Sequence, residues 1–310
     1  MTVDSAERRV PVGAARAGGY EVVLVAYRSR DLVAALLARL PAEVPVAVVD
    51  NARGVDGVQQ VCADRAGTRY LAGQGQGFAR AANLGAKTSR ARYVVFVNPD
   101  SAPTVHQMEA LVGDLRADDR LAAAGATTVR PDGRVELGVG GWEPTVGRAV
   151  MYACGLHRAF PRAGLFARPV PGRPLELDWL SGACLAVPRE RFLQLGGFDE
   201  AFFVYNEDMA YGRRVREAGL RMLLRTDLLV PHLGGGSGDA RPLMLQMRGA
   251  SMVRYLSAHH GAPTVTGIRV ALSLGALLRC AVAAARGARG AAGEQLAYLR
   301  GLWRGAPDLT

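Results

Sequence analysis

The chain of 310 residues is long enough to bury a sizeable hydrophobic core, in one large domain or in two ordinary ones. Apolar residues make up 49% of it and charged residues 21%, which excludes a wholly disordered chain and a fibrous repeat. The formal net charge of +10 favours anionic partners. These include nucleic acids, phosphorylated substrates and acidic membrane surfaces, and the charge alone does not choose among them.

The cysteines and the first residues of the chain favour a reducing, cytosolic setting. The four cysteines form no C-x-x-C pair and are too widely separated to indicate a zinc knuckle or a disulfide framework. Residues 1–18 hold no apolar stretch of the kind found in secretory signals. We expect them to form a flexible tail.

Short apolar runs alternate with helix-forming segments from Tyr20 onward. The runs are rich in β-branched residues, as in buried strands, and the segments between them carry apolar residues at helical spacing. Alternation of strand and helix implies parallel pairing in an α/β sheet. We expect strands at 21–27, 44–49, 69–71 and 93–97, and helices at about 31–40, 78–88 and 104–115.

The second half of the chain has a mixed pattern of strands, turns and prolines. Residues 130–134, Arg-Pro-Asp-Gly-Arg, predict a hairpin turn. Residues 140–174 are rich in glycine, proline and arginine without periodicity, which is typical of a long loop or an insertion. This half is therefore expected to be α+β rather than doubly wound.

Residues 239–310 are alanine-rich and predicted to be helical. Within them, the apolar run 268–285 is interrupted by Arg269 and Arg279, which makes it a poor transmembrane span. We therefore expect a main domain over 19–238, divided at residue 130, followed by a helical appendage.

Polar residues follow three of the predicted strands: Tyr27, Asp50 with Asn51, and Asn98 with Asp100. A single aspartate after a strand is usually a turn or helix-cap residue. Open parallel sheets, however, bind ligands beyond the carboxyl ends of their strands, so three polar ends together favour a site. Asn98 and Asp100 can present oxygen ligands to Mg²⁺ or Mn²⁺, which would bridge to a diphosphate, and Asp100 supplies the full charge.

Two further features of the second half are candidates for chemistry. Glu207 and Asp208 follow an aromatic segment at the start of a predicted helix over 208–218, where capping is the structural alternative. His232 precedes the glycine-rich segment 233–237. A lone histidine is more often structural than a ligand, but its place beside a flexible loop makes it a candidate.

Two glycine-containing motifs do not support nucleotide-binding enzymes of other classes. Gly73-Gln-Gly-Gln-Gly77 lacks the third glycine of the dinucleotide fingerprint, which disfavours a nicotinamide enzyme. Gly85-Ala-Lys-Thr88 has an alanine where a P-loop requires the glycine before lysine.

Eight segments in order give the chain, from Tyr20 to Ser237, a close resemblance to glycosyltransferase family 2. The resemblance is specifically to the GT-A fold and to the rhamnosyltransferase-like branch. The segments are 23–29, Val48-Val-Asp-Asn51, Gly77-Phe-Ala-Arg-Ala-Ala-Asn-Leu-Gly85, Asn98-Pro-Asp100, Trp179-Leu-Ser-Gly-Ala-Cys184, Gly196-Gly-Phe-Asp199, Phe203-Val-Tyr-Asn-Glu-Asp208 and His232-Leu-Gly-Gly-Gly-Ser237. It implies a Rossmann-like, mostly parallel central sheet flanked by helices, a mixed acceptor half and C-terminal helices.

The resemblance also implies roles for individual residues. Asp208 would be the general base. Two residues depart from the family pattern. Arg28 stands at a position that is commonly Asn, and Ala210 stands where the family often has a second acidic residue. The residues implied to bind the nucleotide are Tyr27, Asp50, Asn51 and Asn83; those near the metal and diphosphate are Asn98, Asp100 and His232; and those shaping the sugar and acceptor site are Trp179, Ser181, Gly182 and Glu207.

The expected activity is inverting, metal-dependent transfer of a sugar, with dTDP-rhamnose as the favoured donor, to a cell-envelope glycan or a polyprenyl-linked acceptor. UDP-galactofuranose, UDP-glucose or another donor is the alternative within the fold. A non-catalytic membrane-surface protein is the alternative of another class, whereas nucleic-acid binding is disfavoured because no basic, aromatic face is found. The expected location is the cytoplasm, with the C-terminal helices on the inner face of the cell membrane. Arg269, Arg279 and Arg286 are expected to form the basic edge of an interfacial helix. The sequence indicates no oligomeric state.

Overall fold

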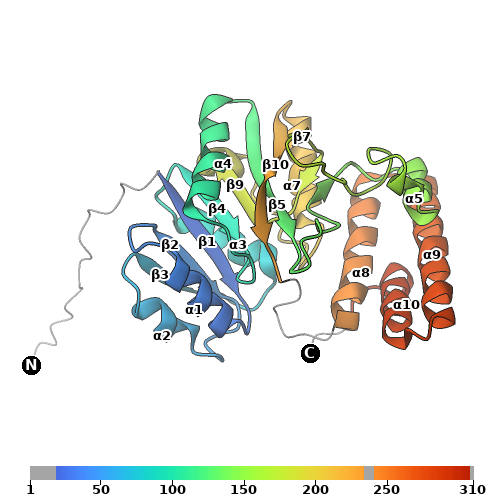
Figure 1. Cartoon of the computed structure of the whole chain (residues 1–310), viewed down its shortest axis with the longest axis horizontal. Helices are drawn as coiled ribbons and strands as arrows, with labels where there is room; N and C mark the ends of the chain where they lie inside the picture. Colours follow the sequence, from blue (N-terminus) through green and yellow to red (C-terminus); the bar gives the residue numbers. More distant parts are fainter. Residues whose placement is uncertain (1–18, 234–240, 308–310) are drawn as a thin grey trace, which may run out of the picture.

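The computed structural model describes residues 19–233 and 241–307, so the predicted tail and most of the glycine-rich segment after His232 lie outside the described residues. Its centre is an eight-stranded sheet (Figure 1). The strands, in spatial order, are β3 (Thr68–Ala72), β2 (Val46–Asp50), β1 (Tyr20–Ala26), β4 (Tyr93–Val97), β9 (Cys184–Pro188), β5 (Leu121–Val129), β10 (Arg221–Pro231) and β7 (Leu175–Glu176).

The sheet is mostly parallel, with two exceptions. β3, β2, β1 and β4 are parallel neighbours, and β10 runs parallel to β5. β9 is antiparallel to both β4 and β5, and the short β7 is antiparallel to β10. The expected strand–helix alternation over the first hundred residues is therefore present, and the mixed pairing begins in the second half, as the change in composition predicts.

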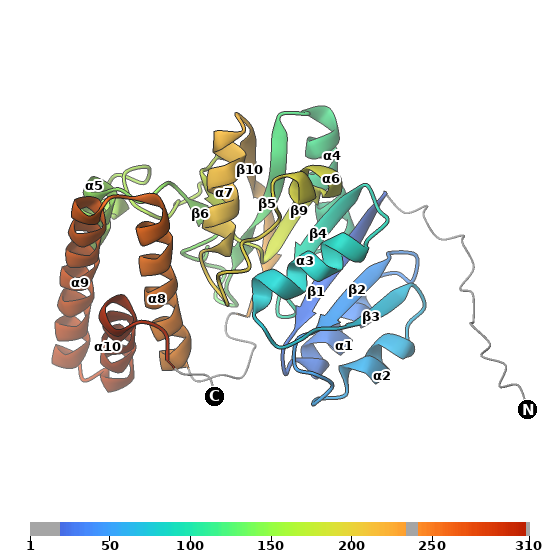
Figure 2. The ribbon, with the colours of Figure 1, turned by 180° about the vertical axis from the view of Figure 1, so that it is seen from behind.

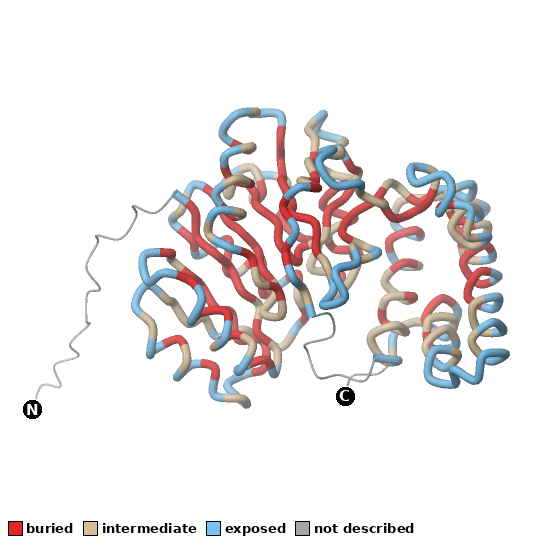
Figure 3. Tube along the Cα trace, viewed as in Figure 1, coloured by how far each residue is buried: buried red, intermediate tan, exposed pale blue. Residues whose placement is uncertain are grey.

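Helices cover both faces of the sheet, because successive strand residues point to opposite sides. Val22 and Leu24 face a core shared with α1 (Arg30–Arg39), α2 (Val58–Ala63) and α4 (Val105–Ala117). Val23, on the other face, packs in a core with α3 (Phe78–Thr88), α6 (Arg189–Gln194) and α7 (Glu207–Glu217) (Figure 2). Figure 3 shows the strands of the sheet as the most continuously buried part of the chain.

The predicted hairpin turn is present, since the Gly133 N–H donates to the Arg130 carbonyl at 2.8 Å. Residues 140–174, predicted to be a long loop or an insertion, contain short regular elements. This stretch holds β6 (Gly140–Gly141), paired with β8 (Trp179–Leu180), then α5 (Val146–Ala153) and a 3-10 turn at Leu156–Arg158. The glycine- and proline-rich composition gave no helical periodicity that would indicate α5. The signal that was present is Thr145, which caps the helix by accepting from the Arg148 N–H at 3.2 Å.

Three C-terminal helices form a bundle beside the sheet (Figure 1): α8 (Arg241–His259), α9 (Ala262–Ala285) and α10 (Arg289–Arg304). Glycines allow α8 and α10 to approach closely, because a Cβ at Gly249 would meet the Tyr298 carbonyl and one at Gly301 would meet the Gln246 carbonyl. α5 packs against α9 in the same way, with Gly275 facing Ala153.

The predicted basic edge on α9 is wrong for two of its three arginines. Arg269 donates to the Leu302 carbonyl at 2.8 Å and stacks on the Trp303 ring at 4.2 Å, and Arg279 donates to Gln295 at 3.0 Å. Both charges therefore face neighbouring helices, and Arg286 alone is exposed. Among the described residues α9 is also the one helix long and apolar enough to cross a membrane by length and composition. The sequence, by contrast, predicts a poor transmembrane span because Arg269 and Arg279 interrupt the apolar run.

Candidate active site

The polar strand ends meet at one edge of the sheet. Ala26 pairs in register with Asp50, and Leu24 pairs with Val97, so β1, β2 and β4 end together. β5 and β10 end at the same edge, and the antiparallel β9 begins there. The residues that this topology gathers are Tyr27, Asp50, Asn51, Asn98, Asp100, Ser181, Gly182 and His232.

Asp50 is fully buried and orders the loop that follows it. One carboxylate oxygen accepts from the Ala52 N–H at 2.8 Å, and the other accepts from the Gly54 N–H at 2.6 Å and the Tyr70 hydroxyl at 2.8 Å. Both oxygens are thus used within the protein. The direct role of Asp50 in this structure is to shape residues 51–54, and contact with a base stays a prediction.

Asn51 ties the glycine-rich loop to the sheet edge. Its side chain donates to the Gly77 carbonyl at 3.2 Å and accepts from the Gly75 N–H at 3.0 Å. Gly77 has a φ of 97°, and a Cβ there would collide with the backbone of Phe203, whose carbonyl accepts from the Phe78 N–H at 2.7 Å. The loop therefore fixes the aromatic segment that leads to Glu207 and Asp208.

Tyr27 and Asn83 lie in different environments. Tyr27 is half-buried at the edge, with the Arg28 guanidinium 5.6 Å from its ring centroid. Asn83 is buried on α3, where it donates to the Phe198 carbonyl and accepts from the Phe198 N–H, both at 2.8 Å. The structure therefore uses Asn83 to fasten the segment around Phe198 and does not turn its amide toward the other nucleotide candidates.

His232 lies between two carboxylates. Its Nε2 is 3.1 Å from Asp100, and its Nδ1 is 2.6 Å from Glu136, which also accepts from the Thr128 hydroxyl at 2.7 Å. Burial by itself lowers the pKa of His232, but the hydrogen bonds to the two carboxylates outweigh it and raise that pKa to about 9. The charged imidazole therefore offsets part of the negative charge of Asp100 and Glu136.

The Asp100–His232–Glu136 group has the donor chemistry that Mn²⁺ and Mg²⁺ accept, two carboxylates and an imidazole. Asn98 lies beside it, with its N–H donating to the Ala183 carbonyl at 3.1 Å. Across residues 19–233 and 241–307, however, no three acidic, histidine or cysteine side chains are already arranged to hold an ion. The residues fit a divalent cation by type, and His232 must turn from its carboxylate partners to serve as a ligand.

Glu207 and Asp208 begin α7 after a strained turn. Tyr205 and Asn206 both have a φ of 67°, a conformation that non-glycine residues rarely adopt and that is concentrated at functional sites. Asp208 is half-buried, and its carboxylate accepts from the Met209 N–H at 2.7 Å. Glu207 is buried, and no hydrogen bond to its Oε2 is found within the described part of the chain.

The two carboxyls have different electrostatic environments. Burial, then the charge of Asp208, raises the pKa of Glu207 well above its usual range, so this group favours the neutral acid. Burial raises the pKa of Asp208 to about 6, although the Met209 N–H and the charge of Arg248 act in the opposite direction. Asp208 is therefore ionised at neutral pH. Its pKa is also close enough to neutral pH for the carboxylate to take up a proton, as a general base must.

Trp179, Ser181 and Gly182, predicted to shape the sugar and acceptor site, serve in this structure as packing and backbone elements. The Trp179 ring is buried edge-on against Phe166, with centroids 6.0 Å apart, so it belongs to the core under the site. The Ser181 hydroxyl accepts from the Ala183 N–H at 3.3 Å, and Gly182 packs against Phe78.

Sequence reasoning missed two residues of the site, Glu136 and Arg248. Glu136 comes to His232 because the hairpin returns it beside Thr128, where its N–H donates to the Thr128 carbonyl at 3.0 Å. The predicted turn at 130–134 was the available signal. Arg248 comes from α8, 40 residues after Asp208, and no local motif marks it.

The sequence model described as glycosyl transferase family 2 matches residues 21–160. The chain carries a family 2 glycosyltransferase domain. The matched region holds the predicted nucleotide and metal residues except His232.

Curated relatives of the family 2 domain are named as rhamnosyltransferases. The N-acetylglucosaminyl-diphospho-decaprenol L-rhamnosyltransferase of Mycobacterium tuberculosis is 32% identical over 174 residues, which cover 54% of this chain and 52% of the relative. The chain thus spans about half the length of that relative. The rhamnosyltransferase WbbL of Escherichia coli is 22% identical over 214 residues, covering 65% of this chain and 78% of the relative.

Solved structures show that the fold is GT-A. The mannosyltransferase PcManGT of Pyrobaculum calidifontis, solved with GDP-Man and Mn²⁺, has a TM-score of 0.58 at 17% identity and covers 92% of this chain and 87% of its own. GalNAc-T7, solved with UDP, GalNAc and Mn²⁺, has a TM-score of 0.53 at 15% identity and covers 77% of this chain and 48% of its own. The expected mostly parallel, helix-flanked sheet is confirmed.

The hydrogen bonds of Asp50 give a stability prediction. Asp50→Asn should lower the free energy of unfolding by about 1–3 kcal/mol, because one amide oxygen cannot satisfy the buried donors of Ala52, Gly54 and Tyr70. Tyr70→Phe removes one of these donors and should cost about 1 kcal/mol. Urea unfolding measures both variants, and an Asp50→Asn protein as stable as the wild type would contradict the loop-ordering role.

Proposed function

We propose that the protein is an inverting glycosyltransferase that moves a sugar from a nucleotide diphosphate to a lipid-linked or glycan acceptor. The observation that carries the proposal is the position of Asp208. Its half-buried carboxyl begins α7 just after the segment that the glycine-rich loop fixes, and Asn51 ties that loop to the sheet edge where β2 ends. A family 2 domain with a base poised at this edge supports direct displacement.

In the proposed reaction the acceptor hydroxyl oxygen attacks the anomeric carbon as the bond from that carbon to the diphosphate oxygen breaks. The electron pair of that bond leaves with the nucleoside diphosphate, and the hydroxyl proton passes to the Asp208 carboxylate. Attack from the side opposite the leaving group inverts the anomeric centre. Glu207, favoured as the neutral acid, can donate a hydrogen bond without competing as the base.

The nucleotide is proposed to bind beside Tyr27 and the loop that Asp50 and Asn51 order. L-rhamnose from a dTDP donor is the favoured sugar, because both named relatives are rhamnosyltransferases. UDP-galactofuranose or UDP-glucose remains the alternative donor. The acceptor is proposed to be polyprenyl-linked, since the mycobacterial relative is named for a diphospho-decaprenol substrate.

Asp100, with His232, Glu136 and Asn98, is proposed to hold Mg²⁺ or Mn²⁺. Such a cation supplies charge stabilisation to the departing diphosphate when bound. Support comes from the two carboxylates and the imidazole of this group and from the Mn²⁺ present in both solved GT-A neighbours.

The donor and metal are tested together. Binding of dTDP-rhamnose, UDP-galactofuranose, UDP-glucose and GDP-mannose is measured by calorimetry with and without Mn²⁺, followed by transfer assays. We expect one donor to bind best and to need Mn²⁺, and Asp100→Ala to lose that metal dependence, because one carboxylate supplies much of the negative charge at the site. Asp31→Ala, an exposed carboxylate on α1, is the matched control. Unchanged Mn²⁺ dependence in Asp100→Ala would rule out the assignment.

The base is tested by pH and substitution. Transfer should rise as pH increases through about 6, because below its pKa Asp208 is protonated and cannot accept the hydroxyl proton. Asp208→Asn should keep donor affinity and lose roughly 10²-fold or more of the transfer rate. Glu217→Gln, at the exposed far end of the same helix, should transfer normally. An active Asp208→Asn together with an inactive Glu207→Gln would move the role to Glu207.

We also propose that the outer face of the appendage lies on an anionic membrane. Five aliphatic side chains of α9 are 41–61% exposed, and at 100° per residue they fall within an arc of about 140°: Val270, Leu274, Leu277, Leu278 and Val282. Trp303 of α10, 53% exposed, extends this surface through its hydrogen bond to Ser273 at 2.9 Å.

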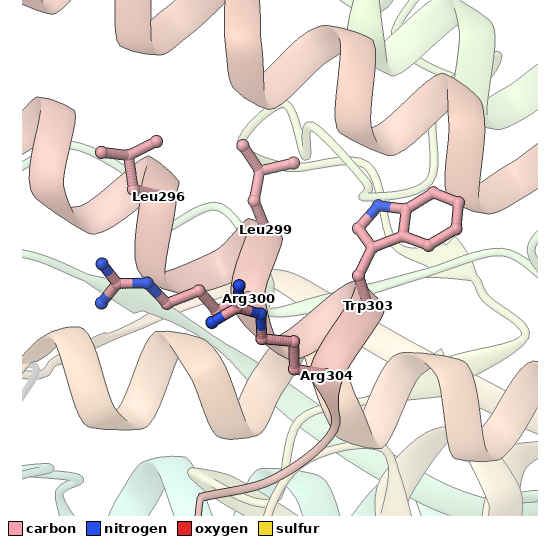
Figure 4. Close-up of a pocket in the computed structure, with 5 residues that line it drawn as sticks. All are labelled: Leu296, Leu299, Arg300, Trp303 and Arg304. Carbon is pink, nitrogen blue, oxygen red and sulfur yellow. The ribbon is translucent and has the colours of Figure 1, made fainter.

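Arginines accompany the apolar surface. Figure 4 shows Arg300 and Arg304 on α10 around the hollow lined by Leu296, Leu299 and Trp303. Residues 262–304 contain six arginines and a single acidic residue, Glu294. An apolar face with an aromatic residue and a cationic border is the composition of a helix that lies in the membrane interface. The same face would serve a non-catalytic membrane protein, but the base and metal groups support an enzyme.

Vesicle co-sedimentation of the full chain tests the membrane face. We expect binding to vesicles containing phosphatidylglycerol, with weaker binding to neutral vesicles. Leu274→Gln with Leu278→Gln should reduce binding about 10-fold or more, since each buried leucine contributes roughly 1.5–3 kcal/mol. Val55→Gln with Val170→Gln, which are 74% and 59% exposed on the sheet domain, is the control pair. An equal loss of vesicle binding in both pairs, or a wild type that does not co-sediment with vesicles, would contradict the proposal.

A further inference from the structure

One face of α8 is turned toward the catalytic residues. Arg248, Ser251, Met252 and Tyr255 follow the i, i+3, i+4, i+7 spacing of a single helix face. The Ser251 hydroxyl donates to the Val204 carbonyl at 2.8 Å, and the Met252 sulfur is 3.9 Å from the Asn206 side-chain nitrogen. The appendage thus holds the strained segment that leads into Glu207 and Asp208.

Arg248 lies on the same face, among aromatic rings, and its charge reaches the proposed base. Its guanidinium lies 5.2 Å from the Phe166 ring centroid and 6.0 Å from that of Tyr205, and a Cβ on Gly138 would be 3.6 Å from it. Its charge acts on Asp208, yet the two side chains form no ion pair within 4.0 Å. Rings therefore hold the guanidinium, and in the part of the chain that the structure describes no carboxylate pairs with it.

A half-buried arginine stacked on rings keeps its N–H donors available along the edge of the guanidinium plane. That arrangement suits a phosphate, which accepts two parallel hydrogen bonds from arginine. A simple counter-ion role is disfavoured, because a direct pair with Asp208 would lower the pKa of the base further and weaken it. The donor diphosphate is proposed to bind at Asp100, at the end of β4, whereas Arg248 lies beside the carboxylate that takes the acceptor proton.

We propose that Arg248 is an acceptor-specificity residue that binds a phosphate of the acceptor next to Asp208. The inference rests on the proposed function and names the acceptor as an alcohol or sugar joined to a phosphate or diphosphate. The appendage then completes the acceptor site, and the sheet domain alone supplies the donor site. Arg248 is a binding residue, and the proton transfer stays with Asp208.

Binding of farnesyl diphosphate and of farnesol to the full chain tests the proposal. EDTA is included so that a metal-bound diphosphate at Asp100 does not contribute. We expect the wild type to bind farnesyl diphosphate more tightly than farnesol, Arg248→Gln to lose about 10- to 100-fold of the diphosphate affinity, and Arg248→Lys to lose less. Farnesol affinity should not change. Arg254→Gln, exposed on the same helix, is the matched control, and thermal melting checks that each variant is folded.

Three outcomes would overturn the proposal. One is a wild type that does not distinguish the two ligands. Another is equal loss for both ligands in Arg248→Gln, which indicates a damaged helix. The third is unchanged farnesyl diphosphate affinity with reduced sedimentation on phosphatidylglycerol vesicles, which assigns Arg248 to lipid headgroups instead. None of these measurements needs sugar transfer, so absence of transfer from every nucleotide sugar would reject the proposed function separately.

Discussion

The carboxylate of Glu143 joins the appendage to the catalytic domain, and the geometry of the acceptor side depends on it. It accepts from Arg213 at 3.1 Å and from Arg216, both on α7, and from the Tyr255 hydroxyl at 2.6 Å and His260 at 2.9 Å, at the end of α8 and just beyond it. Burial opposes its ionisation, but these partners outweigh burial and lower its pKa. Separating the helices would remove the Tyr255 and His260 partners from this half-buried charge, an unfavourable change. α7 and α8 therefore keep a fixed relation.

That fixed relation decides which residues face each other at the start of α7. The strained backbone at Tyr205 and Asn206 turns the chain sharply into the helix, and Ser251 and Met252 of α8 hold the turn from outside. Strain of this kind persists only where surrounding contacts over-determine the backbone. The appendage contacts are such constraints, so the position of Asp208 is set jointly by the sheet domain and by α8.

Local patterns predicted what depends on neighbours in sequence. The strands up to β4 and the helices α1, α3 and α4 were found because buried strands and one-sided helices leave their period in the sequence, whereas the short α2 was not predicted. The GT-A fold followed from the ordered motifs. Contacts between distant segments were not predictable in this way. Glu136 and His232 are 96 residues apart, and Glu143 and His260 are 117 apart. Asn83 was placed near the nucleotide by resemblance, whereas its amide is used entirely by the segment at Phe198.

The two faces of the appendage connect the membrane and acceptor proposals. α8 carries Arg248 toward the base, and α9, which bears the exposed aliphatic side chains, is the helix of the bundle farthest from the sheet (Figure 1). Gly249 and Gly301 bring α8 and α10 into close backbone contact, and packed helices lie about 8–10 Å apart. A surface that binds the outer face would thus lie within one or two helix layers of Arg248. A lipid-linked acceptor would have to extend only that far from the membrane to bring its diphosphate to Arg248, which makes a lipid-linked acceptor and a membrane-bound appendage mutually consistent.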